Sequence, residues 1–106
     1  MSDYEVIHSA YRNLEASQNT ATTNTEYNLT SAGNTKLKHA TFLRIRTDQT
    51  ITVRLNSTDN DAITITTSDV PFVLEHAMIN KIFVSNASGS TAALKILFIG
   101  PPLVSL

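Results

Sequence analysis

A chain of 106 residues with a net charge of −1 is long enough for one domain with one core, and it has no excess of Lys and Arg that would bind nucleic acid or an anionic membrane. It contains no cysteine, which excludes disulfides, thiolate chemistry and Cys-ligated metal sites. Its longest apolar run, ILFIGPPLV, is far shorter than the ~20 residues that cross a bilayer, and its first residues lack the pattern of a signal peptide, so we expect a protein made in a cytoplasm.

Residues 1–26 differ in pattern from the rest and are interpreted as an N-terminal segment. Within SDYEVIHSAYRNLEA, large side chains recur every three or four positions, and Ser2 with Glu5 has the form of a capping box, which favours an amphipathic helix. A strand or extended arm is the alternative, because everything that follows is strand-like, and NTATTNTE is typical of a linker or arm. On either interpretation, the side chains available for contacts are Tyr4, Ile7, Tyr11 and Leu14.

Residues 43–66 alternate between apolar and polar side chains, which is the period of a β-strand with one buried face. A turn near position 48 places Ile45 opposite Ile51. A second turn near position 59 places Val53 opposite Ile65, and both turns keep one face apolar. We therefore predict a three-stranded antiparallel meander whose apolar face consists of Leu43, Ile45, Ile51, Val53, Leu55, Ile63 and Ile65.

The stretch NSTDND, residues 56–61, raises the question of a metal site, because it holds Asp59 and Asp61. Calcium needs six to eight oxygen ligands, whereas these two carboxylates lack the glycine and the distal glutamate of an EF-hand loop. Asn and Asp tolerate the backbone angles of tight turns. We therefore interpret the stretch as the loop of a hairpin.

After Pro71 the apolar residues move to even positions, so a crossing between sheets or a β-bulge must intervene. They are Phe72, Leu74, Ile82, Val84, Leu94, Ile96 and Phe98.

Folding the chain at SNASGSTAA predicts a last hairpin in which Val84 faces Ile96. This hairpin is apolar on its second face too, where Phe83, Leu97 and Ile99 lie. That second face needs a cover, which is either another part of the same chain or a neighbouring subunit.

No catalytic or cofactor signature stands out. The histidines, His8, His39 and His76, are far apart, no acid and base pair can be singled out, and three glycines allow no phosphate-binding loop. We expect no cofactor, no metal and no enzymatic activity.

The run LRIRTDQTITVRLNSTDNDAITITTSDVPFVLEHAMINKIFVSNASGSTAALKILFIG, residues 43–100, resembles the small β-sandwich structural proteins of tailed-bacteriophage virions. The resemblance lies in the ITVRLN strand, the PFVL step and KIFVSNASGSTAALKILFIG, and it covers little of residues 1–30. It implies a non-enzymatic virion component that acts as an oligomer, and it transfers no functional residues.

The expected fold is an all-β antiparallel sandwich, jelly-roll-like, with about seven to nine strands. Residues 27–100 form the sandwich, after an N-terminal arm or short helix over 1–26, and 101–106 form an extended tail. That tail is either an anchor or a frayed end, and its apolar residues are Leu103, Val104 and Leu106.

The leading functional hypothesis is a capsid decoration or cement protein, located in the virion, that binds the major capsid protein as a homo-oligomer, with a trimer favoured. A tail, baseplate or fibre-attached module is the alternative within the same class. A carbohydrate-binding module for host surfaces comes from another class, although the chain has no Trp and its tyrosines are expected outside the regular strands.

Overall fold

The computed structural model describes residues 10–19, 21–29, 37 and 39–101, and within these ranges the chain forms strands and no helix. Accordingly, this part of the chain has no helix that could span a membrane. The strands are β1 (Ala10–Gln18), β2 (Thr22–Asn28), β3 (Ala40–Thr47), β4 (Ile51–Leu55), β5 (Ile63–Ile65), β6 (Phe72–Ile79), β7 (Lys81–Asn86) and β8 (Ala92–Gly100).

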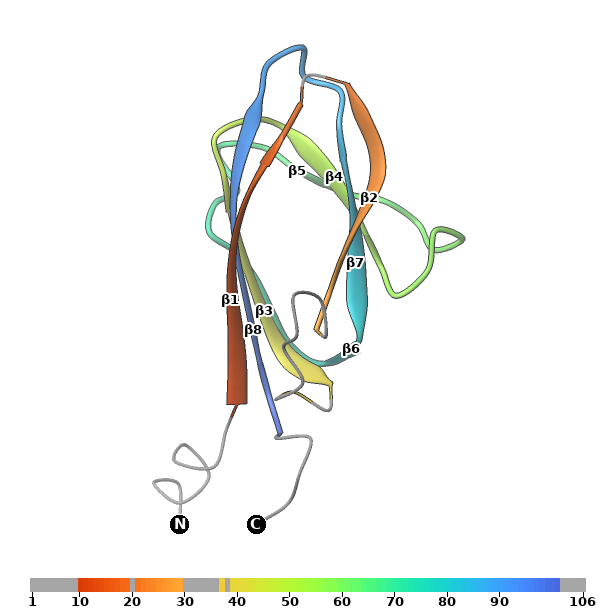
Figure 1. The fold of residues 1–106 in the computed structure, drawn as a ribbon, viewed down its shortest axis with the longest axis vertical. Helices are drawn as coiled ribbons and strands as arrows, with labels where there is room; N and C mark the ends of the chain where they lie inside the picture. The colour runs from red at the N-terminus through yellow and green to blue at the C-terminus, as the bar shows by residue number, and fades with distance from the viewer. Residues whose placement is uncertain (1–9, 20, 30–36, 38, 102–106) are drawn as a thin grey trace.

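The strands form two antiparallel four-stranded sheets that face each other (Figure 1). Sheet A has the order β1-β8-β3-β6, and sheet B has the order β2-β7-β4-β5. The pairing is nested, because β1 pairs with β8, β2 with β7, β3 with β6 and β4 with β5. Every connection between consecutive strands except β4 to β5 therefore crosses from one sheet to the other.

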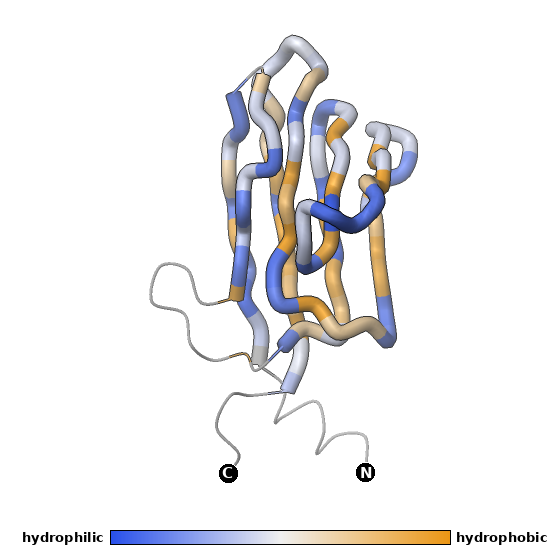
Figure 2. Tube along the Cα trace, turned by 90° about the vertical axis from the view of Figure 1, so that its right-hand side faces the viewer, coloured by the Kyte–Doolittle hydropathy of each residue, from blue (hydrophilic) through white to orange (hydrophobic). Residues whose placement is uncertain are grey.

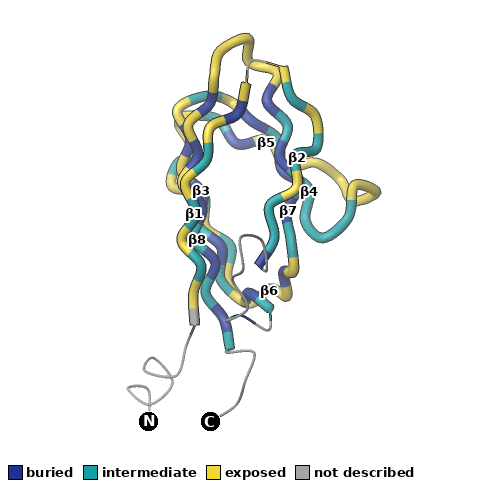
Figure 3. Tube along the Cα trace, in the orientation of Figure 1, coloured by how far each residue is buried: buried dark blue, intermediate teal, exposed yellow. Residues whose placement is uncertain are grey.

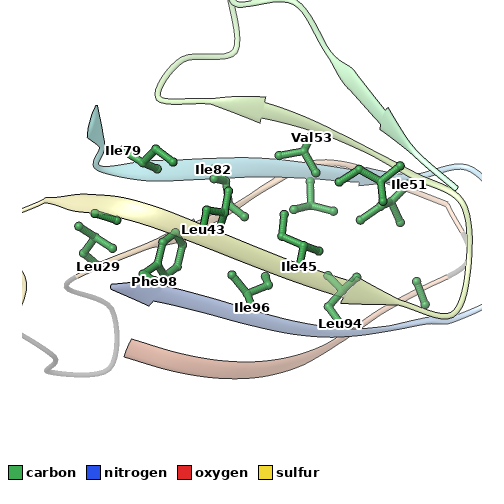
Figure 4. Packing of buried hydrophobic residues seen from close by; sticks show 14 of the residues in the cluster. Leu29, Leu43, Ile45, Ile51, Val53, Ile79, Ile82, Leu94, Ile96 and Phe98 are labelled. Carbon is green, nitrogen blue, oxygen red and sulfur yellow. The ribbon is translucent and has the colours of Figure 1, made fainter. Parts of the chain in front are cut away.

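The core fills the space between the sheets (Figure 4). Alternating strand residues point into it. The buried positions are odd in β3 from Leu43 to Thr47 and in β4 at Ile51 and Val53, and they are even throughout β7 and β8. Figure 2 shows the resulting alternation of hydrophobic and hydrophilic residues along the strands. The apolar faces predicted for these strands are thus confirmed at Leu43, Ile45, Ile51, Val53, Ile65, Ile82, Val84, Leu94, Ile96 and Phe98, all of which are buried.

Two predicted hairpins are wrong, because their strands lie in different sheets. Ile45 pairs with Ile96 of β8 rather than with Ile51, and Val84 pairs with Val53 of β4 rather than with Ile96. An alternating pattern indicates which face of a strand is buried. The pattern is the same whether the chain returns in a hairpin or crosses to the opposite sheet. The side chain of Asp48 helps to hold one crossing, since its Oδ1 accepts a 2.8 Å hydrogen bond from the backbone N–H of Ala93.

The third predicted hairpin, β4 with β5, is confirmed as a pair but in a shifted register. Val53 lies opposite Ile63 and not opposite Ile65. The pairing is therefore centred on Thr58 instead of Asp59, although β4 still ends at Leu55 and β5 begins at Ile63. Asn56, which directly follows β4, has a φ of 66°. Its side chain donates to the carbonyl oxygen of Met78 at 3.0 Å and accepts from the N–H of Asn80 at 2.8 Å.

The change of parity expected after Pro71 coincides with a crossing, because β5 lies in sheet B and β6 in sheet A. A β-bulge occurs later, within β6. His76 has a φ of 59°, and the register of β6 against β3 shifts at this point. Before the bulge Leu74 is half-buried against the core, and after it Ile79 is buried, so the inward side changes from even to odd positions.

Residues 10–28, most of which we expected in an N-terminal arm, are two strands of the sheets. β1 pairs with β8 from Ala10↔Gly100 to Gln18↔Ala92, and β2 pairs with β7. The helical alternative does not hold over residues 10–15, and residues 1–9 lie outside the described ranges. The strand pattern of β1 is weak in the sequence because its inward side has polar residues at both ends, Arg12 and Gln18, and apolar residues only between them, Leu14 and Ala16.

Candidate interaction surface

The outward side of sheet A, here called the sheet A face, combines apolar and charged residues in cross-strand rows. The rows follow from the registers of β1, β8, β3 and β6, in which directly opposite residues are neighbours. The first row is Tyr11, Ile99, Phe42 and Glu75, the second is Asn13, Leu97, Arg44 and Val73, and the third is Glu15, Lys95 and Arg46.

Apolar side chains dominate the first two rows. Tyr11 is 63% exposed and Val73 is 42% exposed, which is unusual for large hydrophobic side chains of this domain. Phe42, Leu97 and Ile99 between them are half-buried. These side chains form an apolar band that Arg44 interrupts between Leu97 and Val73. Exposed apolar residues grouped in this way on a small domain are typical of a surface that contacts another molecule.

Three cations lie beside this band. Lys95 and Arg46 are directly opposite each other, and Arg44 is two positions from Arg46 on the same side of β3. Like charges in this arrangement repel each other. None of the three has a carboxylate within 4.0 Å in the part of the chain that the structure describes, although Glu15 lies opposite Lys95 on the far side.

An open hollow of about 260 Å³ adjoins the cations, lined by Arg46, Thr47, Asp48, Val70, Ala93 and Lys95. The carboxylate of Asp48 is held there by its hydrogen bond from Ala93. The lining of the hollow thus combines the charged side chains of Arg46, Asp48 and Lys95 with the apolar Val70 and Ala93. Cations beside aromatic and aliphatic side chains are the composition of protein interfaces, in which Arg, Tyr and Phe are enriched.

The outward side of sheet B differs in composition. Its central row is Thr64, Thr52 and Ser85, which are small and polar. Phe83 is the large apolar residue there, and the ammonium of Lys81 lies 5.5 Å from its ring centroid, so the ring is partly covered within the chain. The sheet A face is thus the more apolar of the two outer faces in the described residues.

The residues predicted from the sequence for an interface are divided by the fold. Tyr11, Leu97 and Ile99 come together on the sheet A face, whereas Phe83 lies on the opposite side of the molecule because β7 belongs to sheet B. Leu14 points inward and packs against the core. The remaining predicted residues lie outside the described ranges; they are Tyr4, Ile7, Leu103, Val104 and Leu106.

Sequence reasoning missed Phe42, Val73 and the three cations. A signal was present, because Phe42 and Val73 are large apolar residues at positions that alternation assigns to solvent. In a strand with one buried face, such a residue indicates a second contact surface. The cations Arg44 and Arg46 were visible as the outward residues of LRIR, but their proximity to Lys95 depends on the pairing of β3 with β8.

The acidic loop between β4 and β5 is held by amide side chains and backbone. Asn60 donates from Nδ2 to the carbonyl oxygen of Leu55 at 2.6 Å, and Arg54 donates from Nη1 to the carbonyl oxygen of Asn60 at 2.6 Å. Asp59 and Asp61 are exposed in this loop, which stands away from the sheets (Figure 3). No group of three or more His, Asp or Glu side chains that could hold a metal ion occurs among the described residues.

Two side chains have shifted acidities. Burial raises the pKa of Tyr27, which lies on β2 at the edge of the core. Hydrogen bonds from the backbone N–H and the hydroxyl of Thr66, both 2.9 Å, lower the pKa of the exposed Asp69 carboxyl. Both shifts have structural causes, and neither residue lies on the sheet A face.

No protein-family model matches this chain, and no curated protein matches it.

Proposed function

We propose that the protein is a non-enzymatic structural component of a phage virion, most simply a decoration protein that binds the capsid shell through its sheet A face. The observation that carries the proposal is the apolar band with exposed Tyr11 and Val73 beside the cations Arg44, Arg46 and Lys95. Such a face suits a broad contact with another protein, since its apolar centre would be desolvated and its cations would meet acidic groups at the rim.

The strand order supports this proposal. We infer that the nested pairing, β1 with β8 through β4 with β5, is that of a jelly roll, a double-sheet fold of eight strands found in viral capsid and lectin domains. A fold alone does not define a function, so the strand order supports the virion role and the composition of the sheet A face carries it.

The attachment points of the two terminal segments also fit a protein that binds a surface. Ala10 pairs with Gly100, so residues 1–9 and residues 102–106 join the domain at the same end of sheet A. That end holds the most apolar row of the sheet A face, which consists of Tyr11, Ile99, Phe42 and Glu75. Both segments are therefore attached beside the proposed contact.

Binding to particles that lack the protein tests the proposal. Val73→Asp adds a charge to the exposed part of the apolar band, and Thr64→Asp adds the same charge at an exposed position on the opposite side. We expect Val73→Asp to weaken attachment by about tenfold or more and Thr64→Asp to leave it unchanged, because only the first removes an apolar side chain from the contact and places a carboxylate opposite Arg44, where it neutralises one of the cations of the face. Equal binding of both variants, or the absence of any binding by the parent protein, would contradict the proposal.

A tail or baseplate module would use the same face, and the part of the particle that binds the purified protein distinguishes it from a head protein. Isolated heads and isolated tails, each incubated with the protein and sedimented, give this answer directly. Binding to heads supports decoration, and binding to tails alone shifts the protein to the second structural role.

One observation favours a carbohydrate-binding role as a second candidate. Tyr11 lies on a strand with 63% of its surface exposed, contrary to our expectation that the tyrosines fall outside the strands. A flat aromatic side chain on a sheet is a common contact for sugar rings. A glycan array probed with the parent protein and with Tyr11→Ala tests this role, which requires binding that Tyr11→Ala abolishes.

A further inference from the structure

The two sheets have four edge strands, and three of them are irregular or short. β5 has only three residues. β6 is interrupted by the bulge at His76, and β2 by a register shift near Asn24, whose φ is 48°. Bulges and short edges are devices that prevent another strand from pairing with a sheet.

β1 is the exception among these edges. It runs for nine residues, and its register against β8 continues without a shift from Ala10↔Gly100 to Gln18↔Ala92. No proline interrupts it, and its outward residues are Tyr11, Asn13, Glu15 and Ser17, among which there is no lysine or arginine. The inward side of β1 carries Arg12, a charge of the kind that can protect an edge, but a long, regular edge without a bulge or a proline still presents backbone N–H and C=O groups to a further strand.

We propose that β1 pairs antiparallel with β1 of a second copy, so that two sheets A join into one continuous sheet across a twofold axis. This deepens the assembly role proposed above and rests on it. The trimer expected from the sequence was argued from a two-sided apolar hairpin, which the structure separates into two sheets.

The side chains of β1 favour one register. In a continuous sheet, an inward residue of one copy must lie opposite an inward residue of the other copy, because directly opposite residues point to the same side. Only registers centred on a single residue meet this condition. Centring on Leu14 aligns the whole strand, with Leu14 opposite its own copy and Asn13 opposite Glu15. Centring on Glu15 would oppose two carboxylates, and centring on Arg12 would oppose two guanidinium groups.

The proposed strand pairing would place two contact surfaces on one side of the dimer. With the axis perpendicular to the joined sheet, both sheet A faces point the same way and their Tyr11 side chains lie in the strands nearest the axis. Two contact surfaces on one particle-binding unit raise the attachment strength through effective concentration.

Position 13 provides the test, because in this register each Asn13 lies opposite Glu15 of the other copy and both residues are exposed. By sedimentation equilibrium we expect Asn13→Lys to tighten the dimer about tenfold, since it adds two opposite-charge pairs, and Asn13→Glu to weaken it about tenfold. The double variant Asn13→Glu with Glu15→Lys restores two such pairs and should recover dimerisation. The matched controls are Thr64→Lys and Thr64→Glu on sheet B, which should leave the dimer unchanged.

Because the chain has no cysteine, a disulfide can report the register directly. Mixing Asn13→Cys with Glu15→Cys protein under oxidising conditions should give mostly mixed dimers, and either variant alone should crosslink far less. Equal effects of Asn13→Lys and Asn13→Glu, or no preference for mixed disulfides, would overturn the proposed pairing. A protein that stays monomeric but still binds particles through Val73 would also contradict the pairing, although the proposed structural role would remain supported. A protein that dimerises but binds no particle would instead contradict the structural role.

Discussion

Replacing each of two adjacent β8 residues by alanine, one at a time, distinguishes the core side of sheet A from its contact side. Ile96 is fully buried between the sheets, whereas its neighbour Leu97 is half-buried on the sheet A face. Ile96→Ala should lower the free energy of unfolding by about 2–5 kcal/mol, since it loses the transfer energy of three carbons and leaves a cavity that the two sheets cannot close. Leu97→Ala should cost about 1 kcal/mol, because solvent fills the space that it leaves.

Thermal unfolding followed by circular dichroism measures the difference. The entropy of unfolding is about 2.1 cal/mol/K per residue, or roughly 0.22 kcal/mol/K for the 106 residues, so Ile96→Ala should lower Tm by about 9–23 °C and Leu97→Ala by about 5 °C. The particle-binding assay should give the opposite order, with Leu97→Ala the weaker binder. Equal losses of stability at the two positions would refute the assignment of the faces and, with it, the contact surface.

Three further outcomes follow from the packing. Measured by urea unfolding, Val53→Asp should lower the free energy of unfolding by about 3–5 kcal/mol and Thr52→Asp by less than about 1 kcal/mol, because only the first places a charge in the core. Similar losses for the two variants would contradict this prediction. Gly100→Ala should cost about 3 kcal/mol by the same assay, since the added carbon overlaps the carbonyl oxygen of His39, and unchanged stability would show that the backbones can separate. Burial raises the pKa of Tyr27, so the contribution of this residue to stability is present below the ordinary tyrosine pKa of about 10 and is lost as the pH rises through the higher folded-state value. Tyr27→Phe should therefore remove this loss of stability at alkaline pH, measured as the free energy of unfolding against pH. An identical loss in both proteins would exclude Tyr27 as its cause.

The faces of the central strands were predictable from the sequence, but their partners were not, apart from the pairing of β4 with β5. The alternation at Ile45, Val53, Ile65 and Ile96 depends only on the period of a strand, which is a local property. Whether the chain turns back or crosses to the other sheet depends on contacts such as Asp48 with Ala93, which join residues 45 positions apart.

β1 shows the limit of pattern reasoning most clearly. Its inward residues include Arg12 and Gln18, so it lacks the apolar alternation that identifies a half-buried strand. It is a strand because β8 provides a complete partner along its length. The sheet A face was predictable only in part for the same reason, since Leu97 and Ile99 were visible in the sequence but their neighbours across the sheet were not.

Locating the chain in a cryo-EM map of the phage particle tests the central claim most directly. The proposed function predicts density for the domain on the outside of the shell, with Tyr11, Phe42 and Val73 of sheet A turned toward the capsid protein and the row of Thr64, Thr52 and Ser85 turned away from it. A particle without this density, or one in which the sheet B side makes the contact, would contradict the account.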